Sequence, residues 1–236
     1  MKKFLVAIDQ GTTSTRTILF DVKGNVKFIS QFEFKQYFPK NGWVEHNPNE
    51  IWKTTVKSLK KVIQKAKQLK GKILSIGITN QRETTILWNK KNGKPVYNAI
   101  VWQDIRTQSF MEVIAQDKDH STRIRNSTGL RPDAYFSASK IRWLLKNVRA
   151  ASELVQAEDL CIGTLDSWLI WNLTGGDSFV TDPSTASRTL LFDIHNLSYD
   201  PWLLDLFQVP VNSVSYTHLR AHETEADLVC RLLLEK

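Results

Sequence analysis

The fold of this chain is set by the stretch Val6-Ala7-Ile8-Asp9-Gln10-Gly11-Thr12-Thr13-Ser14-Thr15-Arg16. It interrupts an apolar run at residues 4–8 with a polar turn, and β-forming residues resume at 17–20. A second turn, residues 23–25, leads to a third β-forming run at 26–34. Short runs joined by tight turns are typical of neighbouring antiparallel strands, so the sequence predicts a three-stranded meander.

The segment at residues 48–69 is predicted to be an amphipathic helix, because its apolar residues recur at helical spacing. Asn47 is the expected N-cap, Pro48 the first helical residue and Glu50 the acidic partner in a capping box. A strand of the buried type is expected next, at residues 73–79. Strands, then a helix, then a strand predict an α/β fold with a mixed sheet and helical cover.

The remaining apolar runs extend this α/β pattern. An Asn92-Gly93 turn lies between runs at 84–88 and 96–102, which predicts a hairpin. Further elements are expected as helices at 137–148, 150–156, 166–173 and 201–207, and as a short strand at 160–163.

The charge of the chain raises the question of a nucleic-acid partner. The formal net charge is +8, and the excess of cations lies in the first 96 residues. Many of these cations are lysines on the outer face of the helix at 48–69, where solvated cations usually lie. We therefore expect no nucleic-acid partner, and a steep salt dependence of DNA binding would mark the alternative.

Composition indicates a globular chain in the cytoplasm. Hydrophobic residues make up 42% of it and charged residues 24%. The apolar run at 4–8 is too short for a signal peptide, and no run is long enough to cross a membrane. Two cysteines, Cys161 and Cys230, cannot form a disulfide framework. The sequence therefore predicts a cytoplasmic location and no membrane partner.

The turn after Asp9 has the composition of a phosphate-binding loop. Gly11 permits close approach of the backbone, and the residues after it supply hydroxyl groups and one guanidinium. The candidate nucleotide-binding residues are Thr12, Thr13, Ser14 and Arg16. Asp9 is the candidate Mg²⁺ ligand, directly or through water. The loop is not a Walker A motif, and an ordinary hairpin turn is the alternative.

A second polar segment, Asn80-Gln81-Arg82-Glu83, follows the strand predicted at 73–79. An adjacent cation and carboxylate can hydrogen-bond two neighbouring hydroxyls, with Arg82 donating and Glu83 accepting. The alternative is an internal ion pair that closes the strand end. Trp102 and Tyr135 lie in later polar segments, and core packing is the alternative for each of them.

These segments together resemble the FGGY carbohydrate-kinase family, whose members share the actin-like, ribonuclease-H-like ATPase fold. The loop at 6–16 and the segment at 80–85 are most similar to the members that phosphorylate glycerol. The resemblance implies that Arg82 and Glu83 hold glycerol hydroxyls, that Trp102 covers the carbon chain, and that Tyr135 offers its hydroxyl. Blocks at 163–171 and 181–189 also match, and we expect them to complete the domain rather than contact substrate.

The resemblance implies ATP- and Mg²⁺-dependent phosphorylation of glycerol to glycerol 3-phosphate by a full-length protein of which this chain is the amino-terminal part. The resemblance extends over residues 1–212, which are predicted to be an incomplete kinase domain. Residues 213–236 do not resemble the family and are predicted to be an artefactual tail similar to translated sequencing adapters. The family's catalytic base lies in a Gly-Asp-Gln segment, which this sequence lacks. No catalytic residue is therefore assigned, and this chain alone is expected to be inactive.

Two alternative functions remain open. The first is another sugar kinase of the same family, which Gln10 and the segment at 80–85 disfavour. The second is a non-catalytic protein that binds glycerol or a nucleotide. Homo-oligomerisation of the full-length form also stays open.

Overall fold

A computed structural model describes residues 1–217 of the chain. Its strands are β1 (Lys2–Gln10), β2 (Ser14–Asp21), β3 (Val26–Glu33), β4 (Gln36–Tyr37), β5 (Glu45–His46), β6 (Gly71–Asn80), β7 (Thr85–Asn89), β8 (Ala99–Ile100), β9 (Leu160–Thr164), β10 (Val180–Thr181), β11 (Phe192–Asp193), β12 (Ser198–Tyr199) and β13 (Tyr216–Thr217). Its helices are α1 (Pro48–Gln68), α2 (Gln108–Gln116), α3 (Lys118–Thr128), α4 (Ser137–Asn147), α5 (Arg149–Gln156), α6 (Leu165–Leu173), α7 (Pro183–Ala186) and α8 (Pro201–Leu206), with a 3₁₀ turn η1 (Val211–Ser213).

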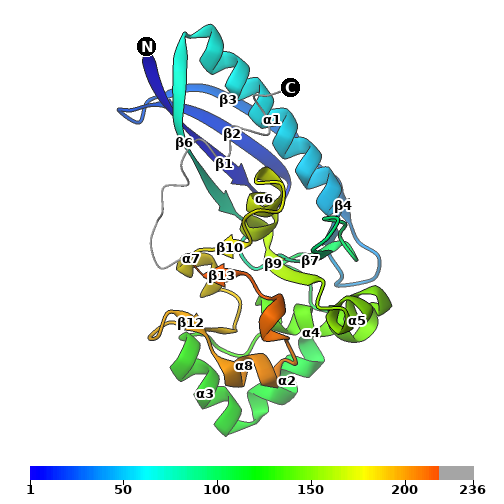
Figure 1. Cartoon of the computed structure of the whole chain (residues 1–236). Helices are drawn as coiled ribbons and strands as arrows, with labels where there is room; N and C mark the ends of the chain where they lie inside the picture. Colours follow the sequence, from blue (N-terminus) through cyan, green and yellow to red (C-terminus); the bar gives the residue numbers. More distant parts are fainter. Residues whose placement is uncertain (218–236) are drawn as a thin grey trace.

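The predicted meander is confirmed and forms most of a four-stranded sheet. The strand order is β3-β2-β1-β6. Strand β2 runs antiparallel to both β1 and β3, and β6 runs parallel to β1. The sheet is therefore mixed, as the order of elements predicts. In Figure 1, α1 runs alongside this sheet, and its apolar face packs on Phe4, Val6 and Leu19.

Two details of this region differ from the prediction. Asn47 caps α1 through a 2.9 Å bond from the Asn49 backbone N–H, but Glu50 does not complete a capping box. Its carboxylate instead accepts from the Lys35 backbone N–H and the Tyr37 hydroxyl of the preceding segment. The buried strand expected at 73–79 is β6, which lies at the edge of the sheet and alternates between half-buried and exposed residues.

A second sheet has the order β4-β5-β8-β7-β9. The hairpin predicted around Asn92-Gly93 is confirmed, because β7 runs antiparallel to β8 and Gly93 has the positive φ of +67° that its turn requires. Trp88 and Trp168 meet edge to face in the core behind this sheet. At the opposite end of the molecule from the N-terminus, Figure 1 shows α2, α3 and α8 gathered around a separate part of the core.

The helices predicted at 137–148, 150–156, 166–173 and 201–207 correspond to α4, α5, α6 and α8, and the strand at 160–163 to β9. Helices α2, α3 and α7 were not expected. Among residues 1–217, no helix combines the length and apolar character that a membrane span requires.

The start of the predicted tail lies against the rest of the chain. Ser213 and Ser215 are buried, Val214 bridges to Ile162, and β13 pairs in parallel with β10. The remainder of the predicted tail, 218–236, lies outside the described residues. The division of the chain at residue 212 stays a prediction.

Candidate functional site

A cavity of about 340 Å³ lies at the carboxyl ends of two neighbouring strands. The strands β1 and β6 are parallel, and Gln10 at the end of one is paired with Asn80 at the end of the other. Parallel strands that end together bring their following loops to one place. The predicted phosphate loop and the predicted polyol segment therefore share this cavity, although 70 residues separate them in the sequence.

The loop after β1 is a tight turn in which the Gly11 N–H donates to the Ser14 carbonyl over 3.0 Å. Of its four predicted nucleotide-binding residues, Thr12 lines the cavity. The Thr13 side chain is exposed, and the Ser14 hydroxyl accepts a 2.8 Å bond from Gln31 on β3. For Thr13, Ser14 and Arg16, contact with a nucleotide stays a prediction.

Asp9, the candidate metal ligand, also lines the cavity. Its Oδ2 forms a 2.5 Å ion pair with Arg16 across the β1–β2 hairpin, while Oδ1 carries no hydrogen bond within residues 1–217. This part of the chain holds no group of three or more His, Cys, Asp or Glu side chains arranged around a common point. Asp9 could thus supply one carboxylate oxygen to a cation whose other ligands come from water or from a bound molecule.

Glu83 forms the ion pair that the sequence raised as an alternative, but its partner is not the neighbouring Arg82. Its Oε1 accepts a 2.7 Å bond from Nε of Arg188, which is 105 residues away. The Glu83 side chain is 7% exposed and that of Arg188 31%. Arg82 is exposed at the cavity and makes no ion pair or hydrogen bond within residues 1–217.

The two predicted aromatic residues form another part of the cavity wall. Trp102 and Tyr135 are half-buried, and their ring centroids lie 5.4 Å apart at an angle of 55°. The indole Nε1 of Trp102 donates to the Thr12 hydroxyl over 3.1 Å, so the aromatic wall is tied to the phosphate loop. Neither ring is plain core material, because both border the cavity.

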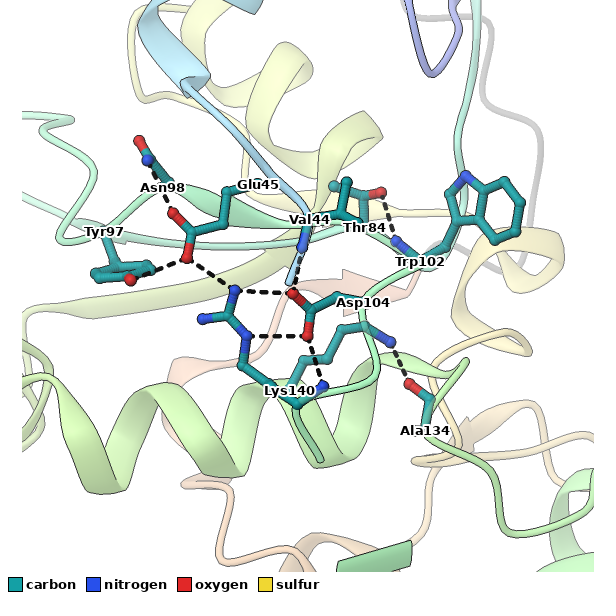
Figure 2. A network of polar contacts seen from close by, with 10 residues as sticks. Val44, Glu45, Thr84, Tyr97, Asn98, Trp102, Asp104, Ala134 and Lys140 are labelled. Carbon is teal, nitrogen blue, oxygen red and sulfur yellow. Dashed lines mark hydrogen bonds and ion pairs between the residues drawn. The ribbon is translucent and has the colours of Figure 1, made fainter. Parts of the chain in front are cut away.

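A buried charge network holds the segment that carries Trp102. Asp104 is 1% exposed and accepts two bonds from the Arg106 guanidinium, at 2.9 and 2.8 Å, and one from the Val44 backbone N–H. Arg106 also donates to Glu45 over 2.7 Å, and its guanidinium lies 3.7 Å from the Trp43 ring centroid. Figure 2 shows Glu45 receiving bonds from Tyr97 and Asn98 on the far side of this network from Trp102.

A buried lysine holds the segment that carries Tyr135. Lys140 on α4 is fully buried, and its Nζ donates to the carbonyls of Ala134, Tyr135 and Phe136. Burial lowers the pKa of Lys140 to about 7, against the opposing attraction of the Asp104, Glu83 and Asp133 carboxylates. Figure 2 shows this side chain reaching from the helix toward the Ala134 carbonyl.

Gln81 on the cavity wall is fixed by buried partners. Its amide donates to the Gly11 carbonyl over 3.1 Å and contacts Nδ1 of His46 at 3.3 Å, while Nε2 of His46 lies 2.6 Å from Oε1 of Gln36. His46 therefore accepts from one amide and donates to the other, which requires the neutral ring. Burial lowers its pKa to about 4.

The two sequence blocks expected to complete the domain differ in their relation to the cavity. In the first block, Asp166 is buried, and its carboxylate lies 3.4 Å from the side-chain amide of Asn80, a cavity residue that it supports. In the second, Arg188 itself lines the cavity, so this block lies nearer to the proposed site than the sequence indicated, and the absence of substrate contact stays a prediction. Its sequence carries no local signal of this, because the pairing with Glu83 depends on the tertiary fold.

Comparison with known proteins relates all but the first three described residues to one family. Residues 4–226 match the model of the N-terminal domain of the FGGY family of carbohydrate kinases. The chain is 53% identical over 210 residues to a glycerol kinase of Dichelobacter nodosus and 51% identical over 209 residues to one of Mycoplasmoides gallisepticum. These alignments cover 89% of this chain, but only 42% and 41% of the two relatives.

Comparison with solved structures relates the fold of this chain to kinases as well. The crystal structure of Plasmodium falciparum glycerol kinase with ADP superimposes with a TM-score of 0.86 at 35% identity, over 92% of this chain and 43% of that chain. A gluconate kinase from Lactobacillus acidophilus superimposes with a TM-score of 0.80 at 23% identity, over 92% of this chain and 42% of that one. The second likeness concerns the fold alone.

Proposed function

Because this chain belongs to the FGGY family of carbohydrate kinases, we propose that it is the amino-terminal part of an enzyme that transfers a phosphoryl group from ATP to glycerol. The chain spans about 42% of the length of the curated relatives that it matches. In this proposal the full-length protein makes glycerol 3-phosphate, and the described region supplies the polyol site and part of the nucleotide site.

The polyol site is proposed to use both charged residues at the end of β6. Arg82 is exposed to the cavity without a protein partner in the described region, so its guanidinium is free to donate to a hydroxyl oxygen. Oε2 of Glu83 has no hydrogen bond within residues 1–217 and can accept from a hydroxyl, since Arg188 occupies Oε1. Trp102 covers the carbon chain with its ring, and Tyr135 offers its hydroxyl.

The nucleotide is proposed to lie at the other side of the same cavity, over the loop after β1. Thr12, Thr13, Ser14 and Arg16 are the residues assigned to its phosphates, as the sequence predicts. Asp9 supplies one carboxylate, which suits Mg²⁺, an ion that keeps several waters and also binds substrate phosphates. When bound there, the ion would neutralise phosphate charge during transfer.

The base that accepts the proton of the attacking hydroxyl is proposed to lie outside this chain. Phosphoryl transfer needs such a residue, positioned against the hydroxyl that attacks. Two described carboxylates line the cavity: Glu83 is bonded to Arg188 and is assigned to hydroxyl binding, and Asp9 is assigned to the metal ion. The 236-residue chain is therefore expected to bind glycerol without phosphorylating it.

The observation that carries this proposal is the shared cavity, in which the loop after β1 and the Arg82–Glu83 segment meet. The test is an assay of ATP-dependent phosphorylation by the full-length gene product, with glycerol, a pentulose and gluconate as acceptors. Phosphorylation of glycerol well above the other two supports the proposal. Preference for a pentulose would instead favour another sugar kinase of the family.

A further inference from the structure

Arg188 is the cavity residue whose role the sequence did not indicate. It follows α7 in a segment that the hydrogen bonds hold firmly. Asp182 caps α7 by accepting from the Ser184 and Thr185 backbone N–H groups, at 2.7 and 3.2 Å. The Thr189 carbonyl accepts a 2.8 Å bond from the Ala138 N–H at the start of α4.

The same end of α4 also holds Glu83. The buried Ser137 hydroxyl donates to the Glu83 carbonyl over 3.1 Å, one residue before Ala138. The start of α4 thus fixes the backbone on both sides of the Glu83–Arg188 ion pair. The two stretches of main chain that carry the charged side chains are therefore tied to the same helix end.

The surroundings of the Arg188 guanidinium leave it only one hydrogen-bonded partner in the described region. Nε bonds Oε1 of Glu83, while the guanidinium carbon lies 5.0 Å from the Phe136 ring centroid and 5.9 Å from that of Tyr135. These rings limit the positions that the guanidinium can take. A planar, always-charged group held in this way fixes the plane of a carboxylate better than an ammonium does.

We infer that Arg188 is the positioning residue that keeps the Glu83 carboxylate oriented to receive polyol hydroxyls, an inference that rests on the proposed function. Arg188 occupies one oxygen of Glu83 and leaves the other for the polyol. It also balances the charge of a carboxylate that is almost fully buried. Arg82 and Arg188 thus have separate tasks, since the first binds the polyol and the second acts through Glu83.

The test is calorimetric titration of glycerol into the 236-residue chain, into four variants of the ion pair and into one control variant. Arg188→Met is expected to weaken glycerol binding about tenfold, the effect of losing one charged hydrogen bond. Arg188→Lys should recover part of that loss. Glu83→Gln should weaken binding at least as much, and the double variant should be no weaker than Glu83→Gln alone, because Arg188 acts through Glu83.

Arg149→Met is the matched control, since it removes another arginine–glutamate pair, on the exposed surface of α5 and away from the cavity. It should bind glycerol as the unaltered chain does. Equal affinity of Arg188→Met and the unaltered chain, or additive losses in the double variant, would overturn the positioning role alone. Absence of glycerol binding by the unaltered chain would overturn both this role and the proposed polyol site. Far-UV circular dichroism of each variant separates loss of folding from loss of binding.

Discussion

Nε of Arg188 lies 2.7 Å from Oε1 of Glu83, while Arg82, the sequence neighbour of that glutamate, makes no ion pair in the described part of the chain. A buried carboxylate needs a compensating charge, and the fold supplies it from a segment 105 residues away. The adjacent arginine is thereby left available at the cavity. Substitutions of Arg82 and of Glu83 are therefore expected to have different effects on binding and on stability.

Arg82→Met should weaken glycerol binding about tenfold or more and leave the free energy of unfolding within about 0.5 kcal/mol of the original, because an exposed side chain without a partner contributes little to stability. Glu83→Gln should change both quantities, since it leaves the Arg188 guanidinium without the negative charge that balances it. Urea unfolding and calorimetry on the same preparations measure the two effects. A loss of stability in Arg82→Met equal to that in Glu83→Gln would contradict the assignment of Arg82 to binding alone.

The bond from the Trp102 indole to the Thr12 hydroxyl should couple the aromatic wall to the loop after β1. Trp102→Phe keeps an aromatic ring but removes the donor, and should cost about 1 kcal/mol of unfolding free energy. Thr12→Val removes the acceptor. If the bond matters, the cost of the double variant will be smaller than the sum of the two single costs. Strict additivity would show that the two side chains are independent.

Lys140→Met should destabilise the chain by about 3 kcal/mol, because the carbonyls of Ala134, Tyr135 and Phe136 lose their shared buried donor. The control is Lys146→Met on the exposed face of the same helix, which should stay within about 0.5 kcal/mol. Both are measured by denaturant unfolding. Hydrogen exchange should also become faster near Tyr135 in the first variant only, and unchanged exchange there would contradict the role of Lys140 in holding this segment.

His46 should make the chain sensitive to mild acid. Its pKa is about 4 when folded, against an ordinary 6.5, so between these values the unfolded chain binds a proton that the folded chain does not. Stability therefore falls as the pH drops from 6.5 to 4, by about 3 kcal/mol from this residue. His46→Gln should lose less stability than the original over that interval. Identical losses, measured by urea unfolding at several pH values, would exclude His46 as the source.

Much of the fold could be predicted because its signals are local. The meander shows as short β-forming runs, and α1 shows as apolar residues at helical spacing with Asn47 before them. Helix α3 gave no such signal, since Ile124 and Thr128 are its only buried residues and its remaining positions are polar. Helix α2 has no side-chain N-cap bond to mark its start. The edge position of β6 depends on strand order, which residues 73–79 do not encode.

The candidate site also combines residues that local motifs predict with residues that they do not. Asp9, Thr12, Arg82, Glu83, Trp102 and Tyr135 each lie in a segment with a recognisable motif, and all of them line the cavity. Arg188 and Lys140 were missed because their effect arises from partners that only the tertiary fold supplies. Glu50 was misassigned for a related reason, since Tyr37 and Lys35 take the carboxylate that a capping box would use.

The indole N–H resonance of Trp102 offers the most direct test that the cavity is a glycerol site. The chain contains eight tryptophans, and the Trp102 signal in the ¹H–¹⁵N spectrum can be assigned by its loss in Trp102→Phe. Titration with glycerol should shift this signal in a saturable manner and leave those of the buried Trp88 and Trp168 unchanged. No saturable shift with glycerol, or a shift that appears only with a pentulose, would contradict the assignment of the cavity to glycerol.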